Sequence, residues 1–166
     1  MKIRPFEPVR DFDALKSWDT DERSHALWCA GRMRYPLEKD DLLSLLKDHS
    51  EKYGDLPFTA EDDEGQPVGF FCLAPDESSK IAMLRFIIID SSRRGQGLGR
   101  KMLLLAANHA FAEKGSQEVS LMVFTGNPAA RKCYLSAGFE EDVLTEKAFR
   151  WQEEEWGRLR MGKRRS

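Results

Sequence analysis

The sequence predicts an α/β protein of the mixed (α+β) kind, in which helices flank a central, mostly antiparallel sheet. Two observations favour this class, and the chain length adds the number of domains. Two β-prone segments, 57–61 and 67–73, flank a short acidic turn with a glycine, which is typical of a hairpin. A long apolar run over 81–89 precedes a glycine-rich turn and then a helical apolar pattern over 98–114. The length of 166 residues predicts a single domain, residues 1–166, with one sizeable core.

The N-terminal third predicts one short strand and three helices. Residues 2–9 alternate in polarity, and two prolines place this strand toward the edge of the sheet. Residues 11–18 carry apolar side chains at helical spacing, and Asp11 is the predicted N-cap. Residues 20–36 predict a short helix followed by a loop. Residues 37–53 predict a longer helix, which a glycine ends.

The rest of the chain alternates between predicted strands and helices. Residues 80–90 predict a strand, and its run of isoleucines at 87–89 is typical of a strand buried on both faces. Residues 119–125 predict the next strand. Asn127 is the predicted N-cap of a helix over 128–138, with proline at its first position. The chain is expected to close with a hairpin over 139–149 and 155–161, followed by a solvated basic tail at 163–165.

Composition and charge exclude several classes of protein. The net charge of −2 gives no general attraction to nucleic acid. No apolar run approaches the roughly 20 residues needed to cross a membrane, and no signal peptide precedes the first strand. The three cysteines and three histidines lack the spacing of a metal site. We therefore expect a cytoplasmic protein without a metal, a nucleic-acid partner or a membrane anchor.

The stretch Arg93-Arg94-Gly95-Gln96-Gly97-Leu98-Gly99-Arg100 joins the predicted buried strand to the long helix. Glycines let the backbone approach a ligand closely and adopt positive φ. The first N–H groups of a helix lack intrahelical partners and carry the positive end of its dipole. Together these features predict an anion site suited to a pyrophosphate. The alternative is a turn whose glycines only relieve crowding, and the flanking arginines favour the anion site.

This turn and a second segment together resemble two signatures of the GCN5-related N-acetyltransferase (GNAT) family. Residues 94–99 match Arg or Gln, two residues, Gly, one residue, Gly or Ala. Residues 127–139 match Asn-x-x-Ala-x-x-x-Tyr-x-x-x-Gly-Phe. The resemblance covers nearly the whole chain and is strongest over 80–139. It implies a GNAT-like sheet that splays between its two middle strands, 80–90 and 119–125.

The resemblance implies acetyl-CoA as the cofactor. The strand backbone at 87–89 would pair with the pantetheine arm, and the N–H groups of 94–100 would hold the pyrophosphate. Arg94 and Arg100 would add positive charge nearby. For Asn127 a cofactor contact stays open, because its capping role alone explains its presence. The implied cofactor-binding residues are Ile87, Ile88, Ile89, Arg94, Gly95, Gln96, Gly97, Leu98, Gly99, Arg100 and Asn127.

Tyr134 is the catalytic residue that the resemblance implies. It lies about two helical turns after Asn127, so the two side chains are expected to point the same way. In the family, a tyrosine here donates a proton to the departing CoA thiolate. A phenol with a pKa of about 10 can protonate a thiolate whose acid has a pKa of about 8.5. The alternative is a tyrosine packed only for its area.

The implied reaction is acetyl transfer to a primary amine, of a small molecule or a peptide, by direct attack in a ternary complex. Many family members use a glutamate as the general base, but the comparable positions here hold Met83, Arg85 and Met122. An acceptor with a low amine pKa would need less help from a base. The side chains that remain as alternatives are Glu61 or Asp62 through a water chain, and Glu22 or His25 directly.

The missing glutamates also leave an alternative function open, a domain that senses acyl-CoA without turnover. A nucleotide-binding enzyme is a weaker alternative, because the acidic residue of a dinucleotide fold is absent. The segments 20–36 and 139–156 are expected to choose the acceptor, and a homodimer is left open. An aromatic acceptor pocket is one interpretation, against aromatic residues that only fill the core; its candidates are Trp18, Trp28, Tyr35, Trp151 and Trp156.

Overall fold

The computed structural model describes residues 1–166 and contains one seven-stranded sheet in the order β1-β2-β3-β4-β5-β7-β6. All neighbouring strands pair antiparallel except β4 and β5, which are parallel. The strands are β1 (Lys2–Pro5), β2 (Leu56–Glu61), β3 (Pro67–Asp76), β4 (Ile81–Ile89), β5 (Glu118–Phe124), β6 (Glu140–Trp151) and β7 (Glu154–Arg164). The helices are α1 (Pro8–Trp18), α2 (Glu22–Cys29), α3 (Lys39–Tyr53), α4 (Leu98–Glu113) and α5 (Pro128–Ser136), with a 3₁₀ turn at Ser91–Arg93.

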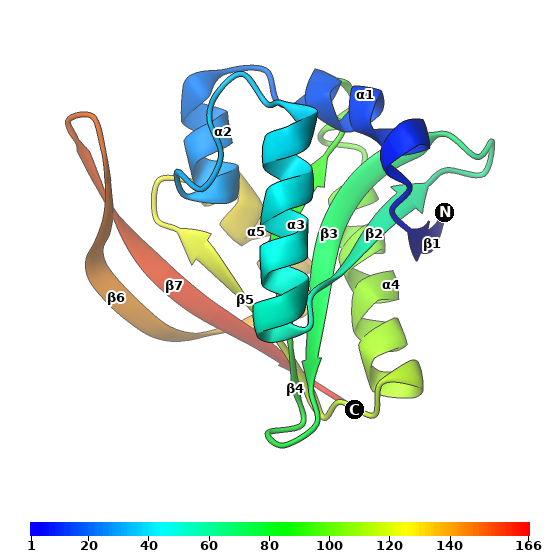
Figure 1. Ribbon diagram of the computed structural model, residues 1–166. Helices are drawn as coiled ribbons and strands as arrows, with labels where there is room; N and C mark the ends of the chain where they lie inside the picture. Colours follow the sequence, from blue (N-terminus) through cyan, green and yellow to red (C-terminus); the bar gives the residue numbers. More distant parts are fainter.

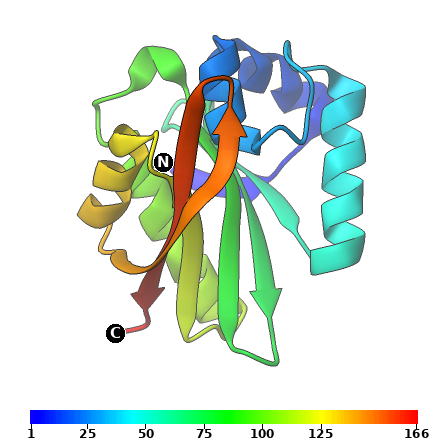
Figure 2. The same ribbon diagram turned by 90° about the vertical axis from the view of Figure 1, so that its left-hand side faces the viewer.

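Helices cover both faces of the sheet (Figures 1 and 2). The face under α4 and α5 carries a cluster of 21 buried residues, among them Met102 and Leu121. The face under α1, α2 and α3 carries a second cluster of 13 residues, among them Leu15 and Phe70. The predicted mixed α/β fold with a mostly antiparallel sheet is therefore confirmed. None of the helices is both long enough and apolar enough to span a bilayer.

The two middle strands of the sheet separate along their length. β4 and β5 pair over only four residues of each strand, from Ile81 opposite Glu118 to Leu84 opposite Leu121. Beyond Leu84, one edge of β4 has no neighbouring strand. The predicted splay between these strands is confirmed, and it leaves a strand edge free within the sheet.

A β-bulge in β4 lies where the strands separate. Phe70 of β3 pairs with Ile88, whereas Cys72 pairs with Arg85, so β4 holds one extra residue between these pairs. Phe86, within the bulge, has a φ of 52°, which a bulky side chain rarely adopts. The bulge shifts the alternation of side chains along the strand. Ala82 and Leu84 join the cluster under α4, whereas Phe86 and Ile88 join the other cluster.

The start of the chain differs from its sequence prediction. The first strand ends at Pro5, and α1 begins at Pro8 with Glu7 as its N-cap, so the prediction of Asp11 as N-cap is wrong. Asp11 instead lies inside the helix, 2% exposed, and accepts hydrogen bonds from the Arg4 guanidinium at 2.8 Å. This carboxylate is held by an ion pair with the neighbouring strand, which a local capping rule does not anticipate.

Two predictions about strands are also wrong. Ile88 is buried, but Ile87 and Ile89 are half-buried, so the end of β4 is not buried on both faces, because these two side chains line a cavity. Lys163 and Arg164 belong to β7 and pair with β5 rather than forming a solvated tail. The second helix, the glycine end of α3 and the closing hairpin are confirmed.

Candidate active site

A cavity of about 1130 Å³ occupies the opening between β4 and β5. Its walls come from the glycine turn, the start of α4, α5, the separating strands, α2, the end of α3 and the β6–β7 hairpin. Gln96 does not line it. The other predicted site residues all do: Ile87, Ile88, Ile89, Arg94, Gly95, Gly97, Leu98, Gly99, Arg100, Asn127 and Tyr134.

The glycine turn presents a row of free backbone donors. None of the N–H groups of residues 94–100 donates a hydrogen bond within the protein, and α4 has no side-chain cap. Gly95 and Gly97 have φ values of 78° and 76°, in the left-handed region that favours glycine. No atom lies within 4 Å of the place where a Cβ would sit on either residue. The turn therefore offers open N–H groups at the positive end of a helix, as an anion site requires.

Gly99 has a packing role that the sequence did not reveal. A Cβ at this position would lie 2.8 Å from Sγ of Cys133 on α5. The missing side chain thus lets α4 and α5 approach closely. Arg100 adds a second link, because its Nε donates to the carbonyl oxygen of Ser136 at 2.9 Å. Together these contacts bring the two sequence signatures side by side.

Basic side chains surround the turn. Arg94 forms no ion pair, and Arg93 is paired with Asp62 at 2.8 Å. Lys132 of α5 also lines the cavity and forms no ion pair. Sequence reasoning missed Lys132, because it occupies a variable position of the second signature and only the fold brings it to the turn.

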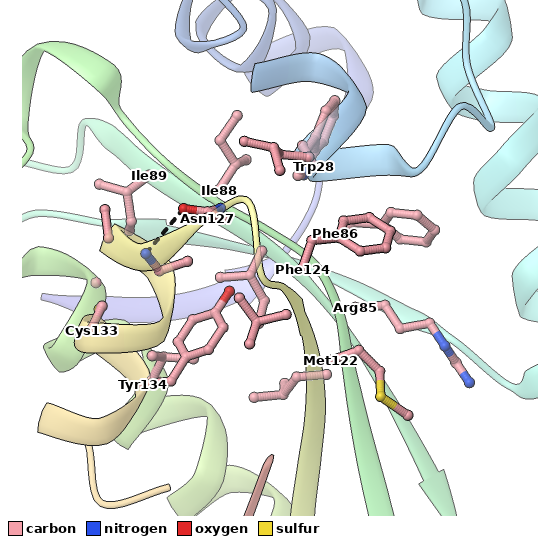
Figure 3. A pocket seen from close by; sticks show the side chains of 18 of the residues that line it. Trp28, Arg85, Phe86, Ile88, Ile89, Met122, Phe124, Asn127, Cys133 and Tyr134 are labelled. Atoms are coloured by element: carbon pink, nitrogen blue, oxygen red, sulfur yellow. Dashed lines mark hydrogen bonds between the residues drawn. The ribbon is translucent and has the colours of Figure 1, made fainter. Parts of the chain in front are cut away.

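Tyr134 projects from α5 toward the gap between β4 and β5 (Figure 3). It is 7% exposed, and its hydroxyl forms no hydrogen bond within the protein although it is not fully enclosed. Burial raises the pKa of Tyr134 above its usual value, and the neighbouring Cys133 thiol raises it further. The phenol therefore keeps its proton at neutral pH. Asn127 accepts a hydrogen bond from the Ala130 N–H at 3.1 Å, which confirms its predicted capping role.

The usual glutamate positions hold no carboxylate in the folded protein. Met83, Arg85 and Met122 all line the cavity. Arg85 points away from Tyr134, toward α3 (Figure 3), and pairs with Asp55. The strands therefore offer no base at these positions.

The acidic alternatives lie elsewhere. Glu61 is 2% exposed at the β1–β2 edge and pairs with Arg4 at 2.8 Å and with two more cations. Asp62 is held by Arg93, and Glu22 is exposed on α2. None of the three carboxylates lines the cavity.

His25 is committed to a structural pair. Its Nδ1 lies 2.6 Å from Asp19 Oδ2, and its Nε2 lies 2.9 Å from the carbonyl oxygen of Met33. Burial alone would lower the pKa of His25, but the hydrogen bonds to Asp19, Cys29 and Met33 raise it to about 10. The ring is therefore protonated at neutral pH, and both of its nitrogens act as donors. It has no lone pair with which to accept a proton.

The aromatic residues divide between the cavity and the core. Trp18 and Trp28 line the cavity, as expected for an aromatic acceptor pocket. Phe124 of β5 and Phe149 of β6 also line it. Trp156 is 2% exposed and stacks on Phe149 with ring centroids 5.8 Å apart. The candidates that do not line the cavity are Tyr35, Trp151 and Trp156.

The distant end of the cavity, bounded by α2, α3 and the β6–β7 hairpin, is short of negative charge. Asp19 is the single carboxylate of the cavity lining, and it is paired with protonated His25. Arg32 and Arg158 line the same cavity, are exposed and form no ion pair. This end of the cavity therefore favours neutral or negatively charged groups over positive ones.

The His25–Asp19 pair predicts a pH-dependent stability. A pKa raised from 6.5 to about 10 means that the stabilisation is fully present below pH 6.5 and is lost as the pH rises through about 10. We expect the difference in unfolding free energy between the wild type and His25→Gln to shrink across this window. Urea denaturation of both proteins at several pH values measures it. A difference that stays constant or grows with pH contradicts this assignment.

Comparison with known proteins agrees with the observed geometry. Residues 12–139 match the acetyltransferase (GNAT) family. The structure is similar to spermidine N-acetyltransferase from Vibrio cholerae in complex with CoA and spermine, with a TM-score of 0.80 and 22% identity over 98% of this chain and 94% of that one. A chimera of Vibrio cholerae SpeG and hSSAT gives a TM-score of 0.78 and 21% identity over 98% and 94%. These structures share the fold, and because the family match spans more than half of the sequence, the chain belongs to the GNAT family of acetyltransferases.

Proposed function

We propose that the protein transfers the acetyl group of acetyl-CoA to a primary amine by direct attack in a ternary complex. The observation that carries the proposal is the row of unpaired N–H groups at 94–100, at the mouth of a gap between two strands. A diphosphate fits the first feature, and an extended amide chain fits the second. CoA contains both groups, with its thiol at the end of the chain.

The residues present fit this cofactor. The N–H groups of 94–100 would hold the pyrophosphate, with Arg94 and Lys132 nearby. The free edge of β4 over 87–89 would pair with the amides of the pantetheine arm, as an added strand does. Bound acetyl-CoA supplies an acetyl thioester as the electrophile. The solved Vibrio cholerae enzyme with CoA and spermine supports this use of the shared fold.

Two groups of the chain would then serve the reaction. A backbone N–H of β4 at the separating edge would stabilise the developing oxyanion. Tyr134 would donate its phenolic proton to the departing thiolate, because its hydroxyl is free, faces the gap and stays protonated at neutral pH.

The charge of the cavity lining limits which amines can be the acceptor. Spermidine and spermine carry several positive charges, and a site for them needs carboxylates. Here the only carboxylate of the cavity, Asp19, is already paired with a protonated histidine, and Arg32 and Arg158 are unpaired. We therefore propose an acceptor with one amino group on a neutral or acidic body, with Trp28 and Phe149 covering its apolar part.

An amine panel tests this function. Thiol release from acetyl-CoA is measured with polyamines, aromatic monoamines, and amino acids or short peptides. We expect turnover with kcat/KM at least tenfold higher for a monoamine or amino acid than for spermine, and acetyl-CoA should raise the Tm more than NAD or ATP does. No thiol release from any amine, despite a raised Tm with acetyl-CoA, would instead support the acyl-CoA sensor. An equal effect of all three nucleotides on the Tm would contradict the cofactor assignment.

Tyr134→Phe should lower kcat by about a hundredfold, the usual range for loss of a general acid, with little change in the KM for acetyl-CoA. The fold should tolerate the change, because the hydroxyl has no partner in the protein. Tyr35→Phe, outside the cavity, is the matched control and should retain wild-type rates. An unchanged kcat in Tyr134→Phe would rule out this role.

A further inference from the structure

We propose that His49 is the general base of the reaction, with its Nε2 accepting the proton of the acceptor ammonium group while Asp55 orients the ring. The inference rests on the proposed acetyl transfer. His49 would supply the general base that is absent at Met83, Arg85 and Met122.

The position of His49 is fixed by the end of α3. The helix stops at Gly54, whose φ of 71° turns the chain back so that Asp55 lies beside the last turn. His49 Nδ1 lies 3.2 Å from Asp55 Oδ2. Asp55 is 1% exposed, and its other oxygen accepts a hydrogen bond from the Arg85 guanidinium. A carboxylate held on both sides fixes the tautomer of the imidazole with hydrogen on Nδ1, which leaves the lone pair on Nε2.

His49 lines the cavity and has one ring nitrogen without a partner. This nitrogen, Nε2, is not enclosed. Its ring packs edge-on against Phe86 with centroids 5.0 Å apart. Phe86 sits in the bulge where β4 leaves β5, next to the strand edge proposed for the pantetheine arm. This contact places His49 beside the bulge of β4, on the α3 side of the cavity.

The other two histidines lack this arrangement. Both ring nitrogens of His25 are bonded. His109 Nε2 is enclosed without a partner, and His109 does not line the cavity. His49 is thus the one histidine that lines the cavity, and its Nε2 is free.

The surroundings of His49 keep it neutral. Burial lowers its pKa below 6.5, Asp55 raises it, and the charges of Arg85 and Arg32 lower it again. Tyr53 packs on the ring from the same helix at 5.1 Å. The net direction is downward, so the imidazole is unprotonated at neutral pH and ready to accept a proton.

The proton balance uses only groups already assigned. The ammonium of the acceptor gives one proton to His49 Nε2, and His49 passes it to water. The neutral amine forms the C–N bond to the thioester carbon, and the C–S bond breaks as Tyr134 protonates the sulfur. The second proton leaves the nitrogen as the amide forms and restores the phenol. One amide, one CoA thiol and one released proton result.

Kinetics of variants test the base. His49→Gln should lower kcat/KM by about a hundredfold at neutral pH and leave the KM for acetyl-CoA nearly unchanged. The limb of the wild-type pH profile below pH 6.5 should disappear. Added imidazole should restore part of the rate of His49→Ala, as a merely structural role would not allow. His109→Gln is the control and should keep the wild-type rate and profile. The proposal is overturned if His49→Gln keeps the wild-type rate or the acidic limb of the pH profile. It is also overturned if His49→Ala loses activity that added imidazole does not restore.

Chemical modification tests the geometry without turnover. Diethylpyrocarbonate reacts with accessible, unprotonated ring nitrogens, so mass spectrometry of the wild type should find His49 modified before His25, whose ring is protonated and bonded at both nitrogens. Modification of His25 before His49, or no modification of His49, overturns the proposal, whatever the activity. A wild type that acetylates no amine, with His49 modified first, would contradict the proposed function while supporting an open Nε2.

Discussion

The separation of β4 from β5 is the constraint on which the rest of the site depends. A parallel pair held over only four residues leaves the β5-facing edge of β4 beyond Leu84 without a partner strand inside a sheet. Unpaired backbone N–H and C=O groups are unfavourable when they are shielded from water. This edge therefore favours a bound ligand whose own donors and acceptors can pair with them. The bulge at Phe86 lies where the strands separate, and it places Phe86 and Ile88 in the cluster under α1, α2 and α3. The cavity exists because β4 and β5 do not pair beyond Leu84 and Leu121.

Both ends of the cavity are positively charged, but the charge comes from different groups at each end. At the glycine turn, backbone N–H groups and Lys132 form a positive surface suited to phosphates. At the other end, Arg32 and Arg158 remain unpaired and the single carboxylate is neutralised by His25. A fold shared at 22% identity does not identify the acceptor, because acceptor choice depends on side chains that vary between such proteins.

The parts of the site with local chemistry could be predicted from the sequence. The turn at 94–100 and the cap at Asn127 depend on glycine conformations and on donors a few residues away, so their roles can be read from the order of residues. The fold class followed from strand and helix periodicity for the same reason. The bulge at Phe86 near the end of β4 could not be predicted, because an unbroken apolar run gives no sign of it.

The parts that depend on distant contacts could not be predicted. Asp55 is six residues from His49 but 30 from Arg85, and their cluster forms only when α3 packs on β4. Asp11 looked like a cap because its partner Arg4 lies on another element, seven residues away. The pairing of Asp19 with His25 likewise converts a candidate base into a cation.

Hydrogen–deuterium exchange with and without acetyl-CoA tests most directly whether the gap between β4 and β5 is the cofactor site. If it is, bound acetyl-CoA should slow amide exchange at two segments, the free edge of β4 over 86–89 and the turn at 94–100. The amides of β1 and β2, on the far edge of the sheet, should be unaffected. Protection confined to other segments, or none at saturating acetyl-CoA, would contradict the account.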